Sequence, residues 1–273
     1  MSELFGSDAD KMQKHNVMKE DFGWEIPMEL VPIPSQGLIY HPDSSLYNKK
    51  TIKIKAMTAK EEDYLASPAL IKEGTALDHV INSCVIDDIN IDDLLVGDKN
   101  AILTSIRITG YGSDYDVKVR CNSCSAFNEV RINLSDLKIK RLEIEPHQKN
   151  TNLFSYKLPI TGKTVLFKFS TTKSEKQKRT HIENLQKLNL ENTVGQVTLL
   201  LEYAIHSIDG VTDKNKVKHF ILNMPARDAK SLRHHIAKYE PGIEMKDNFK
   251  CKSCNSHNHF DIPINSNFFW PSE

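Results

Sequence analysis

Four of the five cysteines in this 273-residue chain fall in two Cys-x-x-Cys pairs, Cys121 with Cys124 and Cys251 with Cys254. Two residues between cysteines let a tight turn direct both sulfur atoms at one ion, and a structural zinc ion takes four such ligands in a tetrahedron. The first pair has no other cysteine or histidine close by, because the next histidine is His147. We therefore expect both pairs to share one structural Zn2+ ion, which requires distant parts of the chain to meet.

Other interpretations of these cysteines stay open. Cys251 and Cys254 are followed by His257 and His259, so this pair has enough ligands for a metal ion of its own, and either histidine is a candidate ligand. Alternatively, the pairs are redox-active motifs, or the four thiols bind no metal. One shared site is favoured because it leaves neither pair with an incomplete ligand set. The fifth cysteine, Cys84, lies in an apolar helical stretch and is expected to be a buried thiol.

Composition gives no indication of a nucleic acid, membrane or acidic partner, because 36 Lys and Arg residues equal 36 Asp and Glu residues. The first ten residues are polar and acidic and lack the apolar core of a signal peptide. The most apolar stretch, near 197–205, is too short to span a bilayer. These features favour a neutral, soluble protein made in the cytosol, where thiols stay reduced.

The two halves of the chain repeat one order of motifs. The segment Ile33-Pro-Ser-Gln-Gly37 returns as Leu158-Pro-Ile-Thr-Gly162, and the pattern of 51–62 returns in 164–175. Each half then runs through helical segments to a strand, a Cys-x-Ser-Cys turn and another strand. The sequence therefore predicts an α+β fold of two diverged copies of a strand–helices–strand unit, related by a pseudo-twofold axis and joined by a zinc-ribbon-like four-cysteine site. The alternative is that the two halves are similar by chance.

This duplication divides the chain into a flexible N-terminal arm (1–30), a first repeat lobe (31–145) and a second repeat lobe (146–273). Alternating apolar residues predict strands at 51–55 and 165–169. Thr58 and Thr171 are expected helix N-caps, Thr58 with the capping-box partner Glu61. Apolar periodicity and the positions of Pro and Gly predict helices near 60–66, 76–85, 99–108, 173–188, 194–207, 214–222 and 226–238.

Several local patterns are better explained by structure than by chemistry. Gly162-Lys-Thr resembles the end of a phosphate-binding loop, but position 157 is lysine and the triplet lies between predicted strands, so it is expected to be a hairpin turn. The acidic stretch 87–93 lacks calcium-loop spacing. The basic runs 173–181 and 227–235 lack interleaved aromatic residues and are expected to be solvated helix faces. No Gly-x-Ser-x-Gly, His-Glu-x-x-His or Gly-x-Gly-x-x-Gly motif is present.

Aromatic residues near both ends are candidates for partner binding. Phe22 and Trp24 lie in the N-terminal arm, and Phe268, Phe269 and Trp270 form an unusually aromatic C-terminal segment. The C-terminal group either packs into the core or anchors a partner. We favour a partner, because interfaces are enriched in large aromatic side chains.

The order of motifs along the first half is distinctive. In chain order these motifs are Pro34-Ser-Gln-Gly37-Leu-Ile-Tyr40, Met57-Thr-Ala-Lys-Glu-Glu-Asp-Tyr-Leu65, Leu70-Ile-Lys-Glu-Gly-Thr-Ala-Leu77, Asp93-Leu-Leu-Val-Gly-Asp98-Lys-Asn-Ala-Ile-Leu103, Arg107-Ile-Thr-Gly-Tyr-Gly112 and Tyr115-Asp-Val117. This order resembles the T4-type bacteriophage baseplate protein family, which comprises hub subunits and hub assembly proteins of contractile-tailed phages. The resemblance is good over 33–137 and continues more weakly to the second cysteine pair.

The resemblance implies a component or assembly factor of the hub beneath the phage tail, made in the host cytoplasm and binding other tail proteins. It carries over no catalytic residue and does not decide whether the chain stays in the virion. A non-enzymatic protein without a small-molecule substrate is expected. The alternatives are a zinc-ribbon protein that binds nucleic acid and a Cys-x-x-Cys thiol redox enzyme, which would need an exposed thiolate of low pKa.

Overall fold

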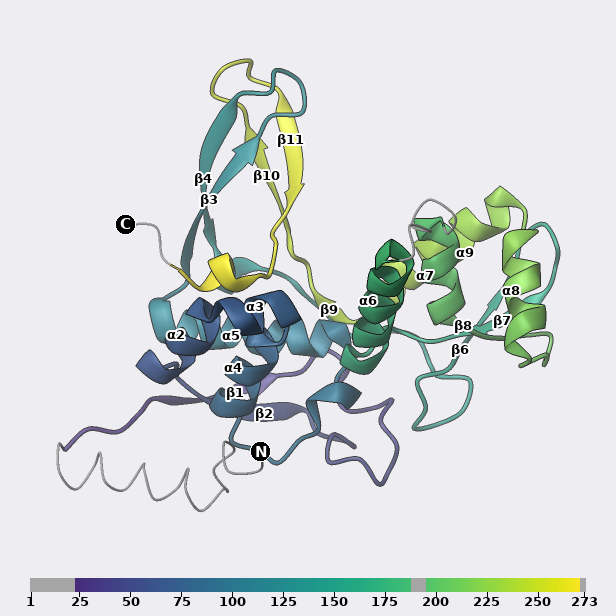
Figure 1. Cartoon of the computed structure of the whole chain (residues 1–273), viewed down its shortest axis with the longest axis horizontal. Coiled ribbons are helices and arrows are strands. Elements are labelled where there is room, and N and C mark those ends of the chain that lie inside the picture. Colours follow the sequence, from purple (N-terminus) through teal and green to yellow (C-terminus); the bar gives the residue numbers. More distant parts are fainter. Residues whose placement is uncertain (1–22, 188–194, 271–273) are drawn as a thin grey trace.

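A computed structural model describes residues 23–187 and 195–270. The described chain forms a first lobe, a second lobe and a stalk of strands that rises from the first lobe (Figure 1). Helices and strands occur together in both lobes, which confirms a mixed α and β fold.

The first lobe packs helices against the inner face of a two-stranded antiparallel sheet. Its elements are β1 (Met28–Pro32), β2 (Thr51–Lys55), α2 (Ala59–Ala66), α3 (Pro68–Glu73), α4 (Ala76–Cys84), η1 (Ile91–Asp93) and α5 (Val96–Tyr111). Val31, Ile52 and Ile54 point inward and are buried, while the alternate residues of both strands point outward. Thr58 and Glu61 form the predicted capping box of α2.

The stalk consists of two antiparallel hairpins, one from each half of the sequence. The first pairs β3 (Asp114–Arg120) with β4 (Phe127–Asn133), and the second pairs β10 (Lys246–Lys250) with β11 (His257–Asp261). Their inner faces meet in a small core of Val119, Cys121, Phe249 and Cys251. The hairpins run side by side, with both cysteine turns at the end farthest from the lobe (Figure 1).

The second lobe is built on a three-stranded antiparallel sheet of order β6-β7-β8. Its elements are β6 (Phe154–Lys157), β7 (Thr164–Phe167), α6 (Thr172–Lys187), α7 (Gln196–Ala204), β8 (Ile205–Ile208), α8 (Lys214–Leu222) and α9 (Ala226–Tyr239). The core contains Phe154, Phe167 and Phe169, whose rings lie 4.6 to 5.7 Å apart. The Gly162 segment is the predicted hairpin turn between β6 and β7.

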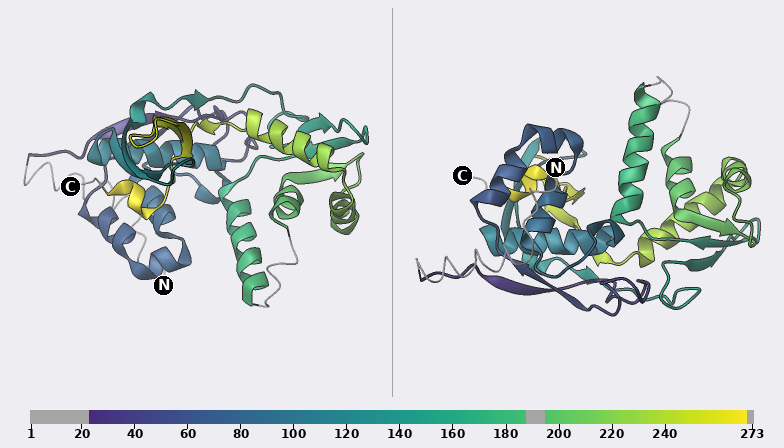
Figure 2. Two further views of the ribbon diagram at one scale, coloured as in Figure 1. Left: turned by 90° about the horizontal axis from the view of Figure 1, so that it is seen from above. Right: turned by 60° about the horizontal axis from the view of Figure 1, so that its bottom comes forward.

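After α9 the chain returns to the first lobe. The short strand β9 (Gly242–Ile243) pairs with β5 (Ile139–Lys140), which follows the one-turn helix η2 (Leu134–Asp136). The chain then forms the second stalk hairpin, followed by η4 (Ser266–Phe269). The predicted boundary at 145/146 thus lies in the segment that links the lobes, but residues 242–270 pack with the first lobe and its stalk (Figure 2).

The lobes also meet through opposite charges. Residues 146–273 carry 19 Lys and Arg against 12 Asp and Glu, and residues 1–145 carry 17 against 24, although the whole chain is neutral. The ammonium group of Lys176 on α6 lies 2.8 Å from Asp78 on α4 and 2.6 Å from Asp92 of η1. Arg179 donates to the carbonyl of Gly74, at the end of α3. Part of the basic run of α6 therefore binds the first lobe, where a bare solvated face was predicted.

Both halves hold their Pro-x-x-Gly loops with a buried aspartate. In the first half, Asp98 accepts hydrogen bonds from the backbone N–H and hydroxyl of Ser35 at 2.9 and 2.5 Å and from the Tyr40 hydroxyl at 2.6 Å. In the second half, Asp228 accepts from the N–H groups of Ile160 and Thr161 at 2.7 and 3.0 Å. Motifs that lie 58 to 68 positions apart are thereby joined, and the same contact occurs in both halves.

Most predicted helices form close to their predicted bounds, with one clear exception. The helix predicted for 194–207 ends at Ala204, because Ile205–Ile208 pairs with β7 and completes the sheet. In the first lobe, Val85 after α4 makes an isolated bridge to Ile54 of β2. The start of the predicted N-terminal arm, residues 1–22, lies outside the described part of the chain.

Candidate metal centre

Each cysteine pair lies in a turn with the same backbone hydrogen bonds. The N–H of Cys121 donates to the carbonyl of Ala126 at 2.9 Å, and the N–H of Ser125 returns to the carbonyl of Cys121 at 3.0 Å. The second turn repeats both bonds, from Cys251 to Ser256 and from Asn255 to Cys251, each at 2.9 Å. Ser125 and Asn255 take left-handed backbone conformations, with φ of 62° and 59°. The repeated turn aims both sulfur atoms of each pair at one point.

The two turns bring the four predicted ligands together. The sulfur atoms of Cys121 and Cys254 lie 3.7 Å apart, those of Cys124 and Cys251 lie 3.6 Å apart, and all four lie within 4.8 Å of one another. A tetrahedron with Zn–S bonds of about 2.3 Å places its sulfur atoms about 3.8 Å apart. The four thiols therefore fit a tetrahedral ion of the size of Zn2+, and the predicted meeting of the two cysteine pairs is confirmed.

Two asparagines beside the cysteine cluster join the hairpins, because each lies on one hairpin and forms hydrogen bonds with the other. The amide Nδ2 of Asn128 donates to the sulfur of Cys251 at 3.6 Å, and that of Asn258 donates to the sulfur of Cys121 at 3.5 Å. Their Oδ1 atoms accept from the backbone N–H groups of Lys252 and Asn122, both at 2.9 Å. Each asparagine stands seven positions after the first cysteine of its pair, a repeated spacing that is visible in the sequence and was missed as a signal of the site.

The electrostatics of the four thiols favour a cation between them. Hydrogen bonds from the Ser256 hydroxyl and from backbone N–H groups lower the pKa of Cys121 to about 5. The N–H of Ala126 favours the thiolate of Cys124, but the surrounding sulfur atoms of Cys254, Cys251 and Cys121 raise the pKa of Cys124 overall to about 12. A divalent cation would remove this repulsion, because metal ligands bind as thiolates and a coordinated thiol loses its proton.

A comparison with protein families identifies the chain. A family described as the T4 bacteriophage base plate protein matches residues 41–270. The chain belongs to this family. No curated protein and no solved structure matches the base plate protein described here. The predicted resemblance is therefore confirmed at the level of the family.

Neither His257 nor His259, which follow the second cysteine pair, belongs to the cysteine cluster of the base plate protein. Among the residues that the structure describes, the four cysteines form the group able to hold a metal ion, while His257 and His259 project from β11 and are exposed. Cys84 is fully buried, as expected, and burial raises its pKa. Sulfur contacts join Cys121 to Cys254 and Cys124 to Cys251, so they link the two pairs, and all four cysteines are free thiols.

The prediction of a C-terminal partner anchor is wrong for Phe268 and Phe269. Both side chains are 0% exposed, and the Phe268 ring lies 5.2 Å from that of Tyr115. The buried guanidinium of Arg107 donates to the Phe268 carbonyl at 3.1 Å, which ties η4 to α5. Burial of an aromatic pair stabilises the fold more than a free aromatic end would. Trp270 and Trp24 remain exposed, and Phe22 lies outside the described residues.

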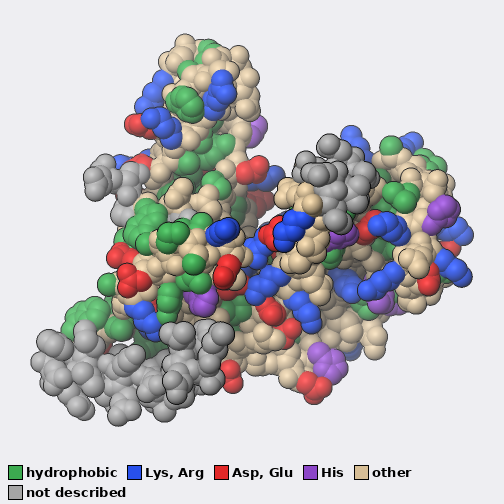
Figure 3. All heavy atoms as spheres, in the orientation of Figure 1, with side chains coloured by type: hydrophobic (Ala, Val, Ile, Leu, Met, Phe, Trp, Pro, Cys, Tyr) green, Lys and Arg blue, Asp and Glu red, His purple; other side chains and the backbone are tan. Residues whose placement is uncertain are grey.

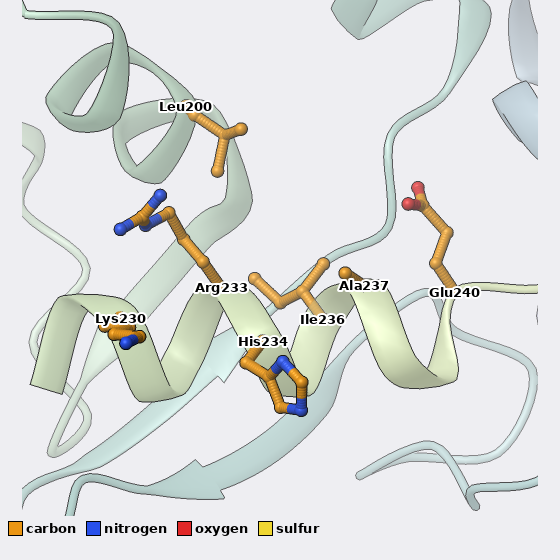
Figure 4. A pocket seen from close by; sticks show the side chains of 7 residues that line it. All are labelled: Leu200, Lys230, Arg233, His234, Ile236, Ala237 and Glu240. Atoms are coloured by element: carbon orange, nitrogen blue, oxygen red, sulfur yellow. The ribbon is translucent and has the colours of Figure 1, made fainter. Parts of the chain in front are cut away.

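A basic hollow lies between α7 and α9 of the second lobe. It measures about 480 Å³, and Arg233 of α9 reaches toward Leu200 of α7 (Figure 4). The other residues that border it are Lys230, His234, Ile236, Ala237 and Glu240. No Phe, Tyr or Trp is among these described residues, so the hollow lacks the stacking surface that single-stranded nucleic acid uses. On the face of this lobe shown in Figure 3, Lys and Arg side chains are interspersed with Asp and Glu side chains.

Buried polar groups outside the metal centre serve structure. Asp98 is 0% exposed, and burial raises its pKa, although hydrogen bonds from Ser35 and Tyr40 oppose this shift. Glu61 accepts from the hydroxyls of Ser83 and Thr58. Each of these carboxylates holds a loop or a helix end and has no open path to a substrate. Among the described helices, none has the length and apolar character needed to cross a membrane.

Replacing either asparagine tests whether its hydrogen bond to a cysteine sulfur strengthens metal binding. Asn128→Ala and Asn258→Ala should each lower the affinity for Zn2+ about 10- to 100-fold, because groups that orient and hydrogen-bond metal ligands have effects of that size. Competition with a chromophoric chelator measures the affinity. Ser253→Ala, in the same turn but exposed, is the matched control and should leave it unchanged. Equal affinities in all three variants would contradict the proposed support.

Acid should weaken the junction of the lobes. Burial alone would raise the pKa of Asp78, but hydrogen bonds from Lys176 and Lys99 outweigh it and lower that pKa. The stabilisation by Asp78 is therefore present above its unfolded pKa of about 3.9 and is lost as pH falls through the lower folded value. Asp78→Asn should cost about 2 kcal/mol in urea unfolding at pH 7, and the difference from wild type should shrink below pH 4. Asp63→Asn, at an exposed position of α2, is the control and should change stability little.

Proposed function

We propose that this base plate protein is a component or assembly factor of the central hub of a phage tail. It acts through contacts with other tail proteins and carries out no catalytic step. It is made and used in the host cytoplasm during tail assembly, and its bound ion is Zn2+ in a structural role. The family match over 41–270 carries this proposal.

The arrangement of the four cysteines supports a structural role for the ion. All four positions of the tetrahedron are taken by cysteine sulfur, which leaves no open position for a water molecule or substrate. The site lies at the far end of a stalk whose hairpins come from different halves of the sequence. An ion there holds two chain segments together and makes the stalk rigid, which suits a protein that works by contact.

Repeated contacts support two diverged copies of one unit. The turns around Cys121 and Cys251, the asparagines at the seventh position and the buried Asp98 and Asp228 each occur once per half. Two similar lobes in one chain offer two related but non-identical surfaces, so one molecule is able to bind two different neighbours. We propose 31–145 and 146–273 as the sequence limits of these copies.

Genetics of the phage tests the proposal. A phage lacking this gene should make heads and free tail proteins but few complete base plates, and a plasmid copy of wild type should restore them. A plasmid copy carrying Cys124→Ser and Cys254→Ser together should fail to restore them, while Ser123→Ala with Ser253→Ala should succeed. Normal base plates in the absence of the gene, seen by electron microscopy, would contradict the proposed role.

A further inference from the structure

On the outer face of the β1–β2 sheet, the apolar side chains of β1 are not covered by any described part of the chain. Met28 and Leu30 point outward from β1 and are 42% and 62% exposed, and Trp24, just before the strand, is 49% exposed. Their neighbours across the sheet are lysines, Lys55 beside Met28 and Lys53 beside Leu30. In both views of Figure 2 no described helix covers this side of the hairpin, whereas α5 packs on the inner side. Singly exposed apolar residues are common, but an alternating row on one strand is not.

The same strand also has a free backbone edge. The N–H of Ala56 donates to the carbonyl of Pro27, and the N–H of Ile33 donates to that of Lys50. Because bonded pairs alternate in an antiparallel ladder, the bonded residues of β1 between these points are Glu29 and Val31. The N–H and C=O groups of Met28 and Leu30 therefore point away from β2. Among the described strands, β2 is the sheet neighbour of β1, so these groups lie on an open edge.

The second lobe shows that the fold does not require an apolar row here. In the second lobe, Ser155 lies three residues before Leu158, whose N–H donates to Lys163 at the end of the β6–β7 pair. In the first lobe, Leu30 lies three residues before Ile33, whose N–H donates to Lys50 in the same way. Ser155 and the following outward residue, Lys157, are polar and exposed. Lysine on an edge strand is a common device against unwanted pairing. β1 carries no lysine, so its edge lacks that protection.

We propose that β1 is a docking strand, to which an extended segment of another tail protein adds as a new antiparallel or parallel strand. The segment pairs with the backbone of Met28 and Leu30 and places apolar side chains beside them in alternate positions, the mode of recognition by strand addition. A glutamate on this segment reaches Lys53, which lies two strand spacings away at about 10 Å. Pro32 has no N–H, so the added strand pairs before that residue. The identity of the partner as a tail protein rests on the proposed function.

Site-specific cross-linking tests the occupant. A photoreactive phenylalanine analogue is placed at Leu30, or at Ser155 as the matched control, in cells that assemble the whole tail. Leu30 should cross-link to one segment of another tail protein, located by mass spectrometry and alternating in apolar residues, and Ser155 should give no such product. Cross-linking of Leu30 only to residues 1–22 of its own chain, or to a second copy of this chain, would overturn the proposal. Equal products from both positions would also overturn it.

Two substitutions separate backbone pairing from side-chain contact. Leu30→Pro removes an N–H that β1 does not use for β2, and Leu30→Asp removes the apolar contact. Each should raise the dissociation constant of the docked segment about tenfold or more. Loss of the buried leucine side chain, or loss of backbone pairing at this residue, changes affinity by at least that factor. Ser155→Pro and Ser155→Asp are the controls, and thermal unfolding shows whether each variant folds.

The outcomes distinguish this inference from the proposed function. If base plates require the gene but assemble normally with folded Leu30→Asp and Leu30→Pro proteins, β1 is not a docking strand while the role in assembly stands. If base plates form without the gene, the proposed function fails first. If Leu30→Asp alone is defective, the contact is made by side chains and strand addition is wrong.

Discussion

Cys251→Ser is expected to unfold the stalk while leaving the second lobe folded. Structural zinc contributes about 10–16 kcal/mol in small zinc modules, which is comparable to the whole stability of an ordinary domain, about 5–15 kcal/mol. The small core between the two hairpins has four buried side chains among the described residues, and two of them are the proposed zinc ligands Cys121 and Cys251. Hydrogen exchange should therefore rise strongly in β3, β4, β10 and β11, whereas β6 and β7 should keep their protection.

The same pattern is expected when a chelator removes the metal from wild type. Ser253→Ala, between the two cysteines of the second pair, is the control and should exchange like wild type. Protection of the stalk that survives both Cys251→Ser and the chelator would show that the hairpins hold together without an ion. The reciprocal bonds of Asn128 and Asn258 would then be sufficient for the join.

Gly97→Ala should destabilise the packing of β9 against α5 by about 3 kcal/mol, at the upper end of the range for overpacking. A Cβ atom at this position would lie 1.8 Å from the carbonyl oxygen of Pro241 and 2.8 Å from the Cα of Gly242. Both neighbours are backbone atoms, so no flexible side chain is able to move aside. For a chain of this size the melting temperature should fall by roughly 6–12 °C.

Gly195→Ala is the matched control, because its added Cβ would meet a single atom at an ordinary 3.5 Å, the hydroxyl of Thr198. Its melting temperature should stay within about two degrees of wild type. If the Gly97→Ala protein were as stable as the Gly195→Ala protein, α5 and β9 would not pack as closely as they do in this structure.

Local patterns made much of the fold predictable. The capping box at Thr58 fixed the start of α2, and the pairs of cysteines predicted both the stalk turns and their meeting. The helix predicted through 207 failed for a tertiary reason. Ile205 and Ile208 are apolar and β-branched, and pairing with β7 outweighs continuation of the helix.

Long-range contacts explain what was missed. Charge balance over the whole chain conceals the excess of acid in 1–145 and of base in 146–273, which meet at Lys176 and Asp78. The buried segment of Phe268 and Phe269 is bound by Arg107, which lies 161 positions before Phe268 and donates to its carbonyl. No local sequence pattern predicts that contact. The asparagines at the seventh position were detectable, because the two knuckles share the spacing Cys-x-Ser-Cys-x-x-x-Asn.

Metal content per chain is the most direct test of one shared site. Elemental analysis should find one zinc ion in untagged wild-type protein and none in Cys121→Ser or in Cys251→Ser, because each pair supplies half of the tetrahedron. No zinc in wild type, or a full zinc ion retained after loss of either pair's cysteine, would contradict the shared four-cysteine site.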